Sequence, residues 1–596
     1  MVSLGGSIIY LLSIPVATMG IFWVKKSKNE LNGISYFIIS VLLTMCYQTF
    51  AAVIVDKLNI TASIYSVGIL NYVLFAVCCL RINSKGIQKY QIKISDIFAL
   101  MAIAIVVLVL GIRQFGADFT DFAYQSSCDC SRHLLFARQL AVKGEITSIP
   151  FMAINTGLVI QALYAFMEPY NDVFVMPITD MIMLYLAGGM MWTLIREKLH
   201  GKGMIFAGIV GTIFYLMGYP LNNMVFGTSY LGSGMTISLL VFSLICRYRN
   251  REMHKVIFVA ALCISFFGLL KSYPMFFPII LVAVLTYYIM QYVKNNIPRL
   301  NKFIPFIFTC LVISCGLSIC FIFKFIPYDS GVIQSLTMEG YMYRNLYGDF
   351  VFLIPFVLYW IYKCYKEKKW SFDFVMIMFM ICYNISFLYA NFIGRCSSYY
   401  YHKLNYLLWA VVFYVLFTVL ETVNKETRQF IAVYFFSVIA MWVFVFSGIE
   451  GRIEIKSIEN GKTVSAELRG WDLFSIYTWN FEHQGMDTIP VPMDEDDEVF
   501  YREVAKITVN EGIQIPCINY TVYGDYEYYA LGYQWEDWQF KWMDPQSALN
   551  RAIEDEYKYI SIIYRHCKEM SDEVWTQLAG YTKIYENNAG CIYQVR

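Results

Sequence analysis

The residues best suited to do chemistry gather in the first long polar stretch of the chain, residues 113–150. Its three acids are Asp118, Asp121 and Asp129. Helical spacing begins near Asp129 and stops at Gly144. His133 lies four residues after Asp129, so one helix face would hold both. A carboxylate beside a basic side chain can keep its charge at a membrane surface and accept a proton from an attacking hydroxyl. We therefore take this stretch as a candidate catalytic loop; the structural alternative is an amphipathic helix lying on the membrane.

A second set of candidates is basic and suits a phosphate group. The segment 391–403 follows an apolar span and ends in a run of tyrosines, a histidine and a lysine. Arg binds phosphate through two parallel hydrogen bonds, and Lys binds it as a point charge. An aromatic belt with ordinary basic anchors is the alternative interpretation of the same segment. The candidate phosphate-binding residues are Arg395, His402, Lys403, Arg344 and Arg138.

The composition determines where these residues must work. The chain has 596 residues, of which 58% are hydrophobic and 15% are charged. The mean hydropathy of +0.50 predicts a polytopic α-helical membrane protein. A net charge of +1 gives no general attraction to nucleic acid. Spans of roughly 20 apolar residues are expected at 4–24, 34–55, 61–80, 95–112, 173–195, 204–220, 229–246, 256–272, 275–293, 303–323, 349–364, 372–390, 402–420 and 429–448, about 14 in all.

Charge in the connecting loops predicts the orientation. Every second loop, beginning with Lys25 and Lys26, carries at least two Lys or Arg residues, and these loops together hold more than twice as many as the others. The positive-inside rule assigns them to the cytoplasm. Residues 1–24 lack a basic start and an A-x-A-like cleavage site, so we expect a first span rather than a removed signal. The protein is then expected in the plasma membrane with its N-terminus and its C-terminal region outside.

Two polar features interrupt the apolar segments. Residues 151–168 are apolar but contain Asn155, Gln161 and Glu168, which predicts a re-entrant or interfacial helix within the loop 113–172. Asp180 lies inside an expected span, and an ionisable group there is a functional candidate by default.

The chain divides into a transmembrane domain, residues 1–448, and an extracytoplasmic α/β domain, residues 449–596. The second part is charged, aromatic and rich in turn residues. We expect helices at 498–509 and 571–580, strands at 513–520 and 557–564, and a final β-hairpin around residues 587–590. Trp471, Trp479, Trp535 and Trp538 can either hold a glycan or form the core of this domain.

The cysteines and the acidic run near residue 494 give little indication of a metal or redox site. No Cys-x-x-Cys pair is present, which argues against zinc and redox chemistry. A disulfide could join two of Cys517, Cys567 and Cys591, and the sequence does not determine which two. The run Asp494–Glu498 lacks the spacing of a calcium loop. No cofactor is indicated with certainty, and the paired acids leave a divalent metal open.

The layout resembles the GT-C superfamily of integral-membrane glycosyltransferases. A large first extracytoplasmic loop with an acidic residue, followed by amphipathic helix, is the hallmark of that family. The matching run is R-H-L-L-F-A-R-Q-L-A-V-K-G-E-I, and the matching residues are Asp129, His133, Ala137, Arg138, Leu140 and Gly144. Three additional helices precede the loop here. Because the family's base commonly lies near the membrane end of the preceding helix, Asp118 and Asp121 remain alternatives to Asp129.

The resemblance implies an inverting glycosyl transfer on the outer face of the membrane. The donor would be a polyprenyl-phosphate-linked sugar, and the acceptor a glycan, lipid or protein. A loop carboxylate would act as the base, and the basic residues would neutralise the leaving phosphate. Two other functions are alternatives. One is a transporter or flippase for lipid-linked saccharides, for which a large outer C-terminal domain is unusual. The other is a polymerase or adapter of a surface-polysaccharide pathway, which would share this topology.

Overall fold

The computed structural model describes most of the chain. The described residues are 3–116, 128–146, 150–301, 304–328, 330–338, 349–350, 353–368, 370–423, 427–428, 431, 454–459, 462–467, 475–482, 495–519, 531–532, 540, 543–564 and 568–596.

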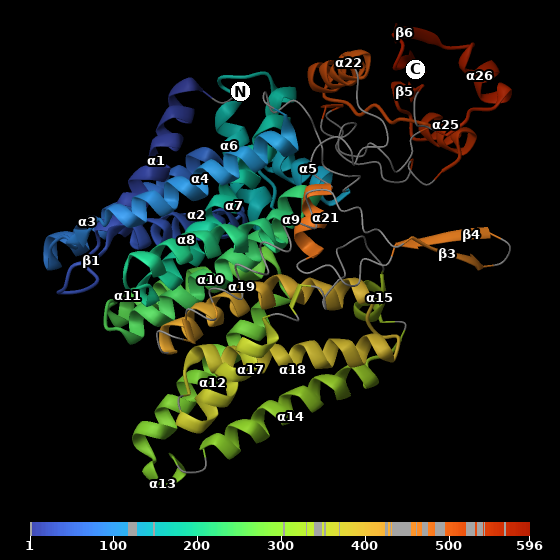
Figure 1. Cartoon of the computed structure of the whole chain (residues 1–596). Coiled ribbons are helices and arrows are strands. Elements are labelled where there is room, and N and C mark those ends of the chain that lie inside the picture. Colours follow the sequence, from blue (N-terminus) through green and yellow to red (C-terminus); the bar gives the residue numbers. More distant parts are fainter. Residues whose placement is uncertain are drawn as a thin grey trace.

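Long apolar helices dominate the first two thirds of the chain (Figure 1). Among the described residues, 12 helical segments are long and apolar enough to cross a membrane. The protein is therefore a polytopic helical membrane protein, as its composition predicts. The helices are α1 (Leu4–Trp23), α2 (Gly33–Lys57), α3 (Ile64–Lys85), α4 (Ile94–Phe115), α5 (Cys128–Lys143), α6 (Phe151–Leu163), α7 (Val175–Ile195), α8 (Lys202–Met217), α9 (Tyr219–Phe226), α10 (Ser229–Arg249), α11 (Lys255–Ser272), α12 (Phe276–Asn296), α13 (Pro298–Asn301), α14 (Ile304–Phe325), α15 (Gly331–Thr337), α17 (Ile354–Glu367), α18 (Phe372–Phe392) and α19 (Ser398–Thr422).

The expected spans match these helices with three exceptions. The span predicted at 349–364 corresponds to α17, which has 14 residues and is shorter than a spanning helix. Most of the span predicted at 429–448 lies outside the described residues. The span predicted at 204–220 is broken at Gly218, which separates α8 from α9. Trp409 packs where a Cβ at Gly218 would lie, at 2.6 Å, so this close approach requires glycine.

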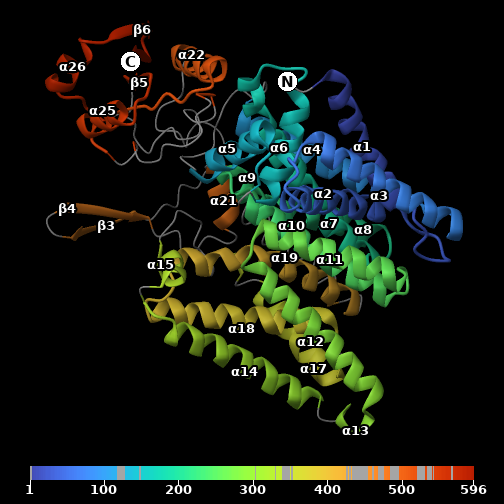
Figure 2. The ribbon, with the colours of Figure 1, turned by 180° about the vertical axis from the view of Figure 1, so that it is seen from behind.

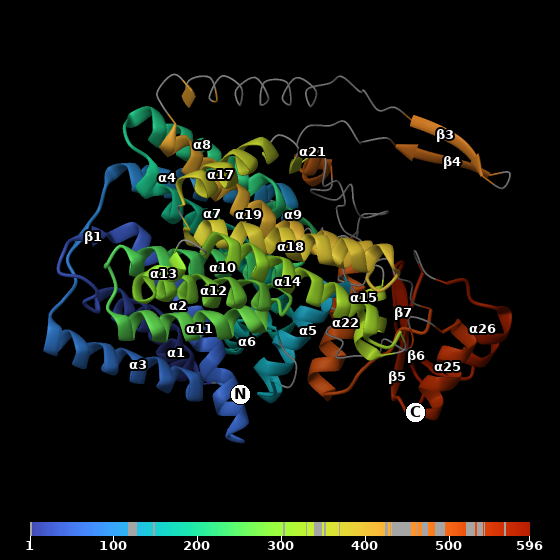
Figure 3. The ribbon, with the colours of Figure 1, turned by 90° about the horizontal axis from the view of Figure 1, so that it is seen from below.

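The long helices lie side by side and give the molecule two distinct ends (Figures 1 and 2). One end carries the short parallel pair β1 (Leu31–Asn32) and β2 (Tyr90–Gln91) beside the basic loops, and we call it the basic end. The opposite end carries α5, α9 and the C-terminal region, and we call it the site end. Helices α12, α14 and α18 form a second group of helices, which α19 joins to the first (Figure 3).

The loop predicted to carry the site folds into a helical hairpin, α5 and α6, that packs inside the site end. Gly144 ends α5 with a φ of +71°, and it lies so close to the backbone of Ala62 that a side chain would collide with it. Gly157 of α6 approaches the carbonyl oxygen of Ala137 on α5 equally closely. The predicted helix and its stop at Gly144 are thus confirmed.

Helix α6 is buried against the bundle rather than lying on its surface. Its 13 residues are too few to span a membrane. Its polar side chains bind other helices: Asn155 donates to the hydroxyl of Thr49 at 2.9 Å, and Gln161 accepts from the backbone N–H of Ile64 at 2.7 Å. Of the two predicted alternatives, this arrangement favours the re-entrant helix over the interfacial one.

The C-terminal region contains a small sheet and several helices. Its described elements are β3 (Glu454–Glu459), β4 (Lys462–Glu467), α21 (Ser475–Glu482), α22 (Glu495–Glu511), α25 (Pro545–Glu554), β5 (Tyr559–Ile563), α26 (Asp572–Leu578), β6 (Thr582–Glu586) and β7 (Gly590–Gln594). An antiparallel sheet has the order β5-β7-β6. The expected helices, the strand at 557–564 and the final hairpin correspond to α22, α26, β5 and β6–β7. The Ser571 side chain caps the start of α26 by accepting from the backbone N–H of Val574.

The strand predicted at 513–520 is not formed. Only Cys517 pairs there, in an isolated bridge with Ser561 of β5, and the adjacent Pro516 has no N–H to extend a ladder. Cys591 lies on β7, on the other side of β5. Two strand spacings of about 4.8 Å separate Cys517 from Cys591, which is too far for a disulfide. Cys517 and Cys591 therefore form no disulfide with each other, and Cys567 lies outside the described residues.

Candidate functional site

A chain of hydrogen bonds at the site end joins the first loop to α19. Asp129 lies in the first turn of α5, Tyr230 at the start of α10, and Lys403 near the start of α19. The Tyr230 hydroxyl donates to Asp129 Oδ2 at 3.0 Å. The same oxygen accepts from Lys403 Nζ at 3.1 Å. The acid and the cation that were predicted from separate segments therefore belong to one cluster, and Tyr230 connects them.

Lys403 is buried in a group of tyrosine rings. Its side chain is 5% exposed. Nζ lies 4.0 Å from the ring centre of Tyr399, 5.0 Å from Tyr400, 5.1 Å from Tyr230 and 5.6 Å from Tyr273. Such ring faces attract a cation, by up to about 2 kcal/mol each where water is excluded. Part of the tyrosine run that could have been a belt therefore surrounds the lysine instead.

His133 completes the α5 side of the cluster. Its ring meets the Tyr230 ring edge to face, with 5.4 Å between the ring centres. Burial lowers the pKa of His133 to about 4, although the nearby Asp129 charge acts in the opposite direction. The imidazole is therefore neutral at pH 7. Its buried Nδ1 has no hydrogen-bond partner among the described residues, which leaves a ring nitrogen able to form one more hydrogen bond.

Arg138 is held away from this cluster by Asp172. Its Nε donates to both carboxylate oxygens at 2.8 and 3.0 Å, and Nη2 donates to Oδ1 at 2.6 Å. The two side chains are 1% and 0% exposed, and the Tyr164 hydroxyl also donates to Asp172, at 2.9 Å. Asp172 belongs to η1 (Pro169–Phe174), the short 3-10 helix before α7. This pairing favours a role in fixing α5 rather than the predicted role in binding phosphate.

The other two described phosphate candidates, Arg395 and His402, precede Lys403 in the chain. Arg395 lies in the link between α18 and α19, where Nη1 donates to the carbonyl of Ile326 at 2.6 Å and the guanidinium covers the Tyr328 ring. His402 precedes Lys403, and its Nδ1 lies 3.2 Å from the side-chain nitrogen of Asn405. Both residues are half-buried at the site end.

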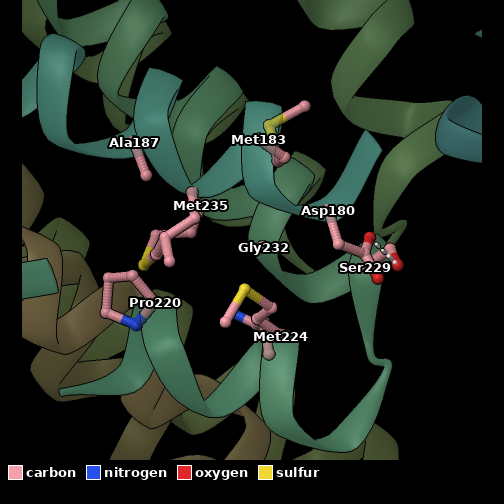
Figure 4. Close-up of a pocket in the computed structure, with 10 residues that line it drawn as sticks. Asp180, Met183, Ala187, Pro220, Met224, Ser229, Gly232 and Met235 are labelled. Carbon is pink, nitrogen blue, oxygen red and sulfur yellow. Dashed lines mark hydrogen bonds between the residues drawn. The ribbon is translucent and has the colours of Figure 1, made fainter. Parts of the chain in front are cut away.

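A second acid, Asp180, contacts the start of α10 at the residue next to Tyr230. The hydroxyl of Ser229, the neighbour of Tyr230, donates to Asp180 Oδ1 at 2.6 Å (Figure 4). Both residues line a cavity of about 20 Å³, which is enough for one water molecule. Met183, Met224 and Met235 provide apolar walls (Figure 4). Two consecutive residues of α10 thus bind two acids, Asp129 and Asp180.

Several predicted residues fall outside the described part of the chain. They are Asp118, Asp121, Arg344, Trp471, Trp535 and Trp538. Trp479, in contrast, belongs to α21 and stacks on Phe226 of α9, with 6.2 Å between the ring centres. It therefore takes part in packing the C-terminal region onto the membrane domain.

A second cavity opens at the basic end, far from this cluster. Its volume is 310 Å³, and it is lined by residues of both charges. Its two buried arginines already pair with acids: Arg196 with Asp96, and Arg247 with Glu197 and Glu252. In the described part of the chain, no group of three or more His, Cys, Asp or Glu side chains lies close enough together to hold a metal ion.

Sequence reasoning missed Tyr230, Tyr273 and Asp172. Tyr230 and Tyr273 lie at the ends of apolar spans, where tyrosine is common for reasons of membrane anchoring alone. Asp172 stands 34 residues from Arg138, so no helical spacing connects them. Neither a protein-family model, nor a curated protein, nor a solved structure matches the chain.

Proposed function

We propose that the protein is a glycosyltransferase that moves a sugar from a polyprenyl-phosphate-linked donor to an acceptor on the outer face of the membrane, with inversion. The hydrogen-bonded chain Asp129–Tyr230–Lys403 is the observation that supports this proposal most strongly. A transfer of this kind needs a base for the acceptor hydroxyl and a cation for the leaving phosphate. This chain of hydrogen bonds holds one acid, Asp129, and one cation, Lys403, close together.

In the proposed reaction, Asp129 takes the proton of the acceptor hydroxyl as its oxygen attacks the anomeric carbon. The bond from that carbon to the phosphate oxygen breaks on the opposite face, which inverts the configuration. Lys403 stabilises the negative charge of the departing polyprenyl phosphate. Arg395, His402 and Arg344 contribute further positive charge to this phosphate in the proposed reaction. Tyr230 keeps the Asp129 carboxylate oriented, and neutral His133 can hold the acceptor hydroxyl through Nδ1.

The test uses the purified protein in liposomes with radiolabelled polyprenyl-phosphate sugars and a cell-envelope fraction as the acceptor. We expect transferred label with the wild type and a loss of about 10²–10⁴-fold in Asp129→Asn, the usual contribution of a general base. Glu145→Gln is the matched control, since Glu145 is an exposed acid just beyond α5. It should keep wild-type activity.

The other outcomes separate the alternatives. Full activity in Asp129→Asn excludes Asp129 as the base, and Asp118→Asn and Asp121→Asn then test the two remaining acids of the loop. If all three variants keep full activity, no carboxylate of this loop is the base. Movement of label across the bilayer without transfer would instead support a flippase for lipid-linked saccharides.

A further inference from the structure

Two helices of the C-terminal region contact two different elements of the membrane domain. Helix α21 packs against α9 (Figures 1 and 2), and α22 packs against η1. Each contact is made by a polar side chain whose partners lead to one half of the site. The acid half is α5, with Asp129 and His133, and the cation half is the start of α19, with His402 and Lys403.

Arg502 of α22 connects the C-terminal region to the acid half. Its Nη1 donates to Asn171 Oδ1 at 3.0 Å, and its guanidinium lies over the Tyr170 ring. Glu498, four residues earlier on α22, accepts from Arg502 Nε at 2.9 Å and fixes the direction of the side chain. Asn171 is followed directly by Asp172, the residue that binds Arg138 of α5. The position of η1 therefore affects the position of α5.

Asn480 of α21 connects the C-terminal region to the cation half. Its side-chain nitrogen donates to the carbonyls of Met217 and Gly218, at 2.8 and 2.7 Å, where α8 breaks into α9. Its oxygen accepts from Asn222 at 2.8 Å. The other end of the Asn222 amide accepts from the Tyr406 hydroxyl at 2.5 Å. Tyr406 lies three residues after Lys403, on the next turn of α19.

A further contact supports the same connection. The backbone N–H of Ile476 on α21 donates to Asp349 Oδ1 at 2.9 Å, and the Tyr219 hydroxyl donates to Asp349 Oδ2 at 3.0 Å. Asn405, beside His402 on α19, donates to the Tyr219 oxygen at 3.5 Å. These groups are buried, so each lost hydrogen bond would leave a polar atom without water to replace it.

We infer that the C-terminal region positions both halves of the candidate site, α5 through Arg502 and α19 through Asn480. Both are positioning residues, since they act through Asn171, Asp172 and Arg138, or through Asn222 and Tyr406. Catalysis depends steeply on such placement, because an error of about 1 Å can lower a rate by roughly a hundred-fold. The expected loss of activity rests on the proposed transfer reaction, whereas the positioning of α5 and α19 by the C-terminal region does not.

Hydrogen exchange of the full-length protein tests the acid half. We expect the peptides of α5 to exchange faster in Arg502→Ala than in the wild type. The matched control is Arg551→Ala, because Arg551 also pairs with an acid four residues away on a helix of the same region. It should leave α5 unchanged. Transfer should fall by roughly 10–100-fold in Arg502→Ala, with a partial recovery in Arg502→Lys.

The cation half is tested in the same way. Asn480→Ala should speed exchange at the start of α19, whereas Asn550→Ala, at an exposed site on α25, should not. If Asn480→Ala fails to fold, Arg502→Ala decides alone. Unchanged exchange of α5 in Arg502→Ala overturns the inference for the acid half, and unchanged exchange of α19 in folded Asn480→Ala overturns it for the cation half. Faster exchange in a protein whose wild type transfers no sugar upholds the inference and refutes the proposed function.

Discussion

The Tyr230 hydroxyl makes two hydrogen bonds in the candidate site: it donates to Asp129 and accepts from Lys403. Without that oxygen, the buried ammonium of Lys403 loses this hydrogen-bond acceptor and keeps the ring faces and the more distant charge of Asp129. A buried charge deprived of a partner is costly. The tyrosine oxygen is thus as important for the folded state as it is for the orientation of the acid.

A double-mutant cycle measures this coupling. Tyr230→Phe should destabilise the protein by about 1–3 kcal/mol, whereas Tyr230→Phe added to Lys403→Met should cost little more than Lys403→Met alone. Thermal unfolding in detergent gives the four free energies. Tyr47→Phe is the control, since its hydroxyl binds the carbonyl of Leu70 away from the site. Strictly additive effects of the two substitutions would show that Tyr230 and Lys403 do not interact.

His133 should make the stability of the protein sensitive to acid. Burial lowers its pKa to about 4, below the ordinary value of 6.5. Between these two pH values, the unfolded chain binds a proton that the folded protein does not bind. The stabilising contribution of the neutral ring is complete above pH 6.5 and is lost as the pH falls toward 4.

The melting temperature should therefore fall more steeply between pH 7 and pH 5 in the wild type than in His133→Asn. His200→Gln changes an exposed histidine and should follow the wild type. Parallel pH curves for the wild type and His133→Asn would contradict the assignment.

At the scale of elements, the end of α5 depends on a residue without a side chain. Gly144 has a φ of +71°, and a Cβ there would meet the Thr61 side chain and lie 2.9 Å from the carbonyl oxygen of Ala62. Gly394 has the same φ of +71° but open space around it. Gly394→Ala thus reports the backbone cost alone, about 1–2 kcal/mol.

Gly144→Ala should destabilise the protein by more than Gly394→Ala, because the collision with Ala62 adds to the backbone cost. Unfolding midpoints of the two variants, measured side by side, provide the comparison. Equal midpoints would mean that the loop before α3 moves freely away from α5.

Substitutions in the Arg138–Asp172 pair test a second contact that holds α5 in place. Arg138→Met leaves Asp172 buried without its main partner, so we expect a loss of about 3–5 kcal/mol. Adding Asp172→Asn should recover part of that loss, since the unpaired charge disappears. Arg551→Met, at an exposed pair, should change the unfolding free energy by less than about 1 kcal/mol. A double variant no more stable than Arg138→Met would contradict this account.

At the scale of the whole molecule, the orientation in the membrane can be tested with the lysines that are already exposed. Lys28, Lys85 and Lys202 lie at the basic end, and Lys558 and Lys583 lie in the C-terminal region. In right-side-out vesicles, an impermeant amine reagent should modify the last two and spare the first three. Mass spectrometry identifies the modified peptides, and opened vesicles serve as the control. The reverse pattern would invert the proposed topology.

The sequence was most informative where a pattern is local. The apolar runs, the stop at Gly144 and the hairpin of β6 and β7 depend on neighbouring residues, and each could be predicted. The candidate site could be predicted only in part: Asp129, His133 and Lys403 carry recognisable chemistry, but Tyr230 gives no local signal that it joins two of them. The strand expected at 513–520 is wrong for residues 513–519, because strand pairing depends on what lies opposite and Pro516 lacks the N–H that a ladder needs.

The short helix α6 has a consequence for how the protein is made. At 13 residues, or about 20 Å, it cannot be inserted as a span of its own while the chain leaves the ribosome. Its neighbours include α1 and α2, made before it, and α10 and α11, made long after it. The α5–α6 hairpin must therefore wait at the membrane until those later helices arrive. The candidate site is assembled late in biosynthesis, although its acid is among the first quarter of the residues to be synthesised.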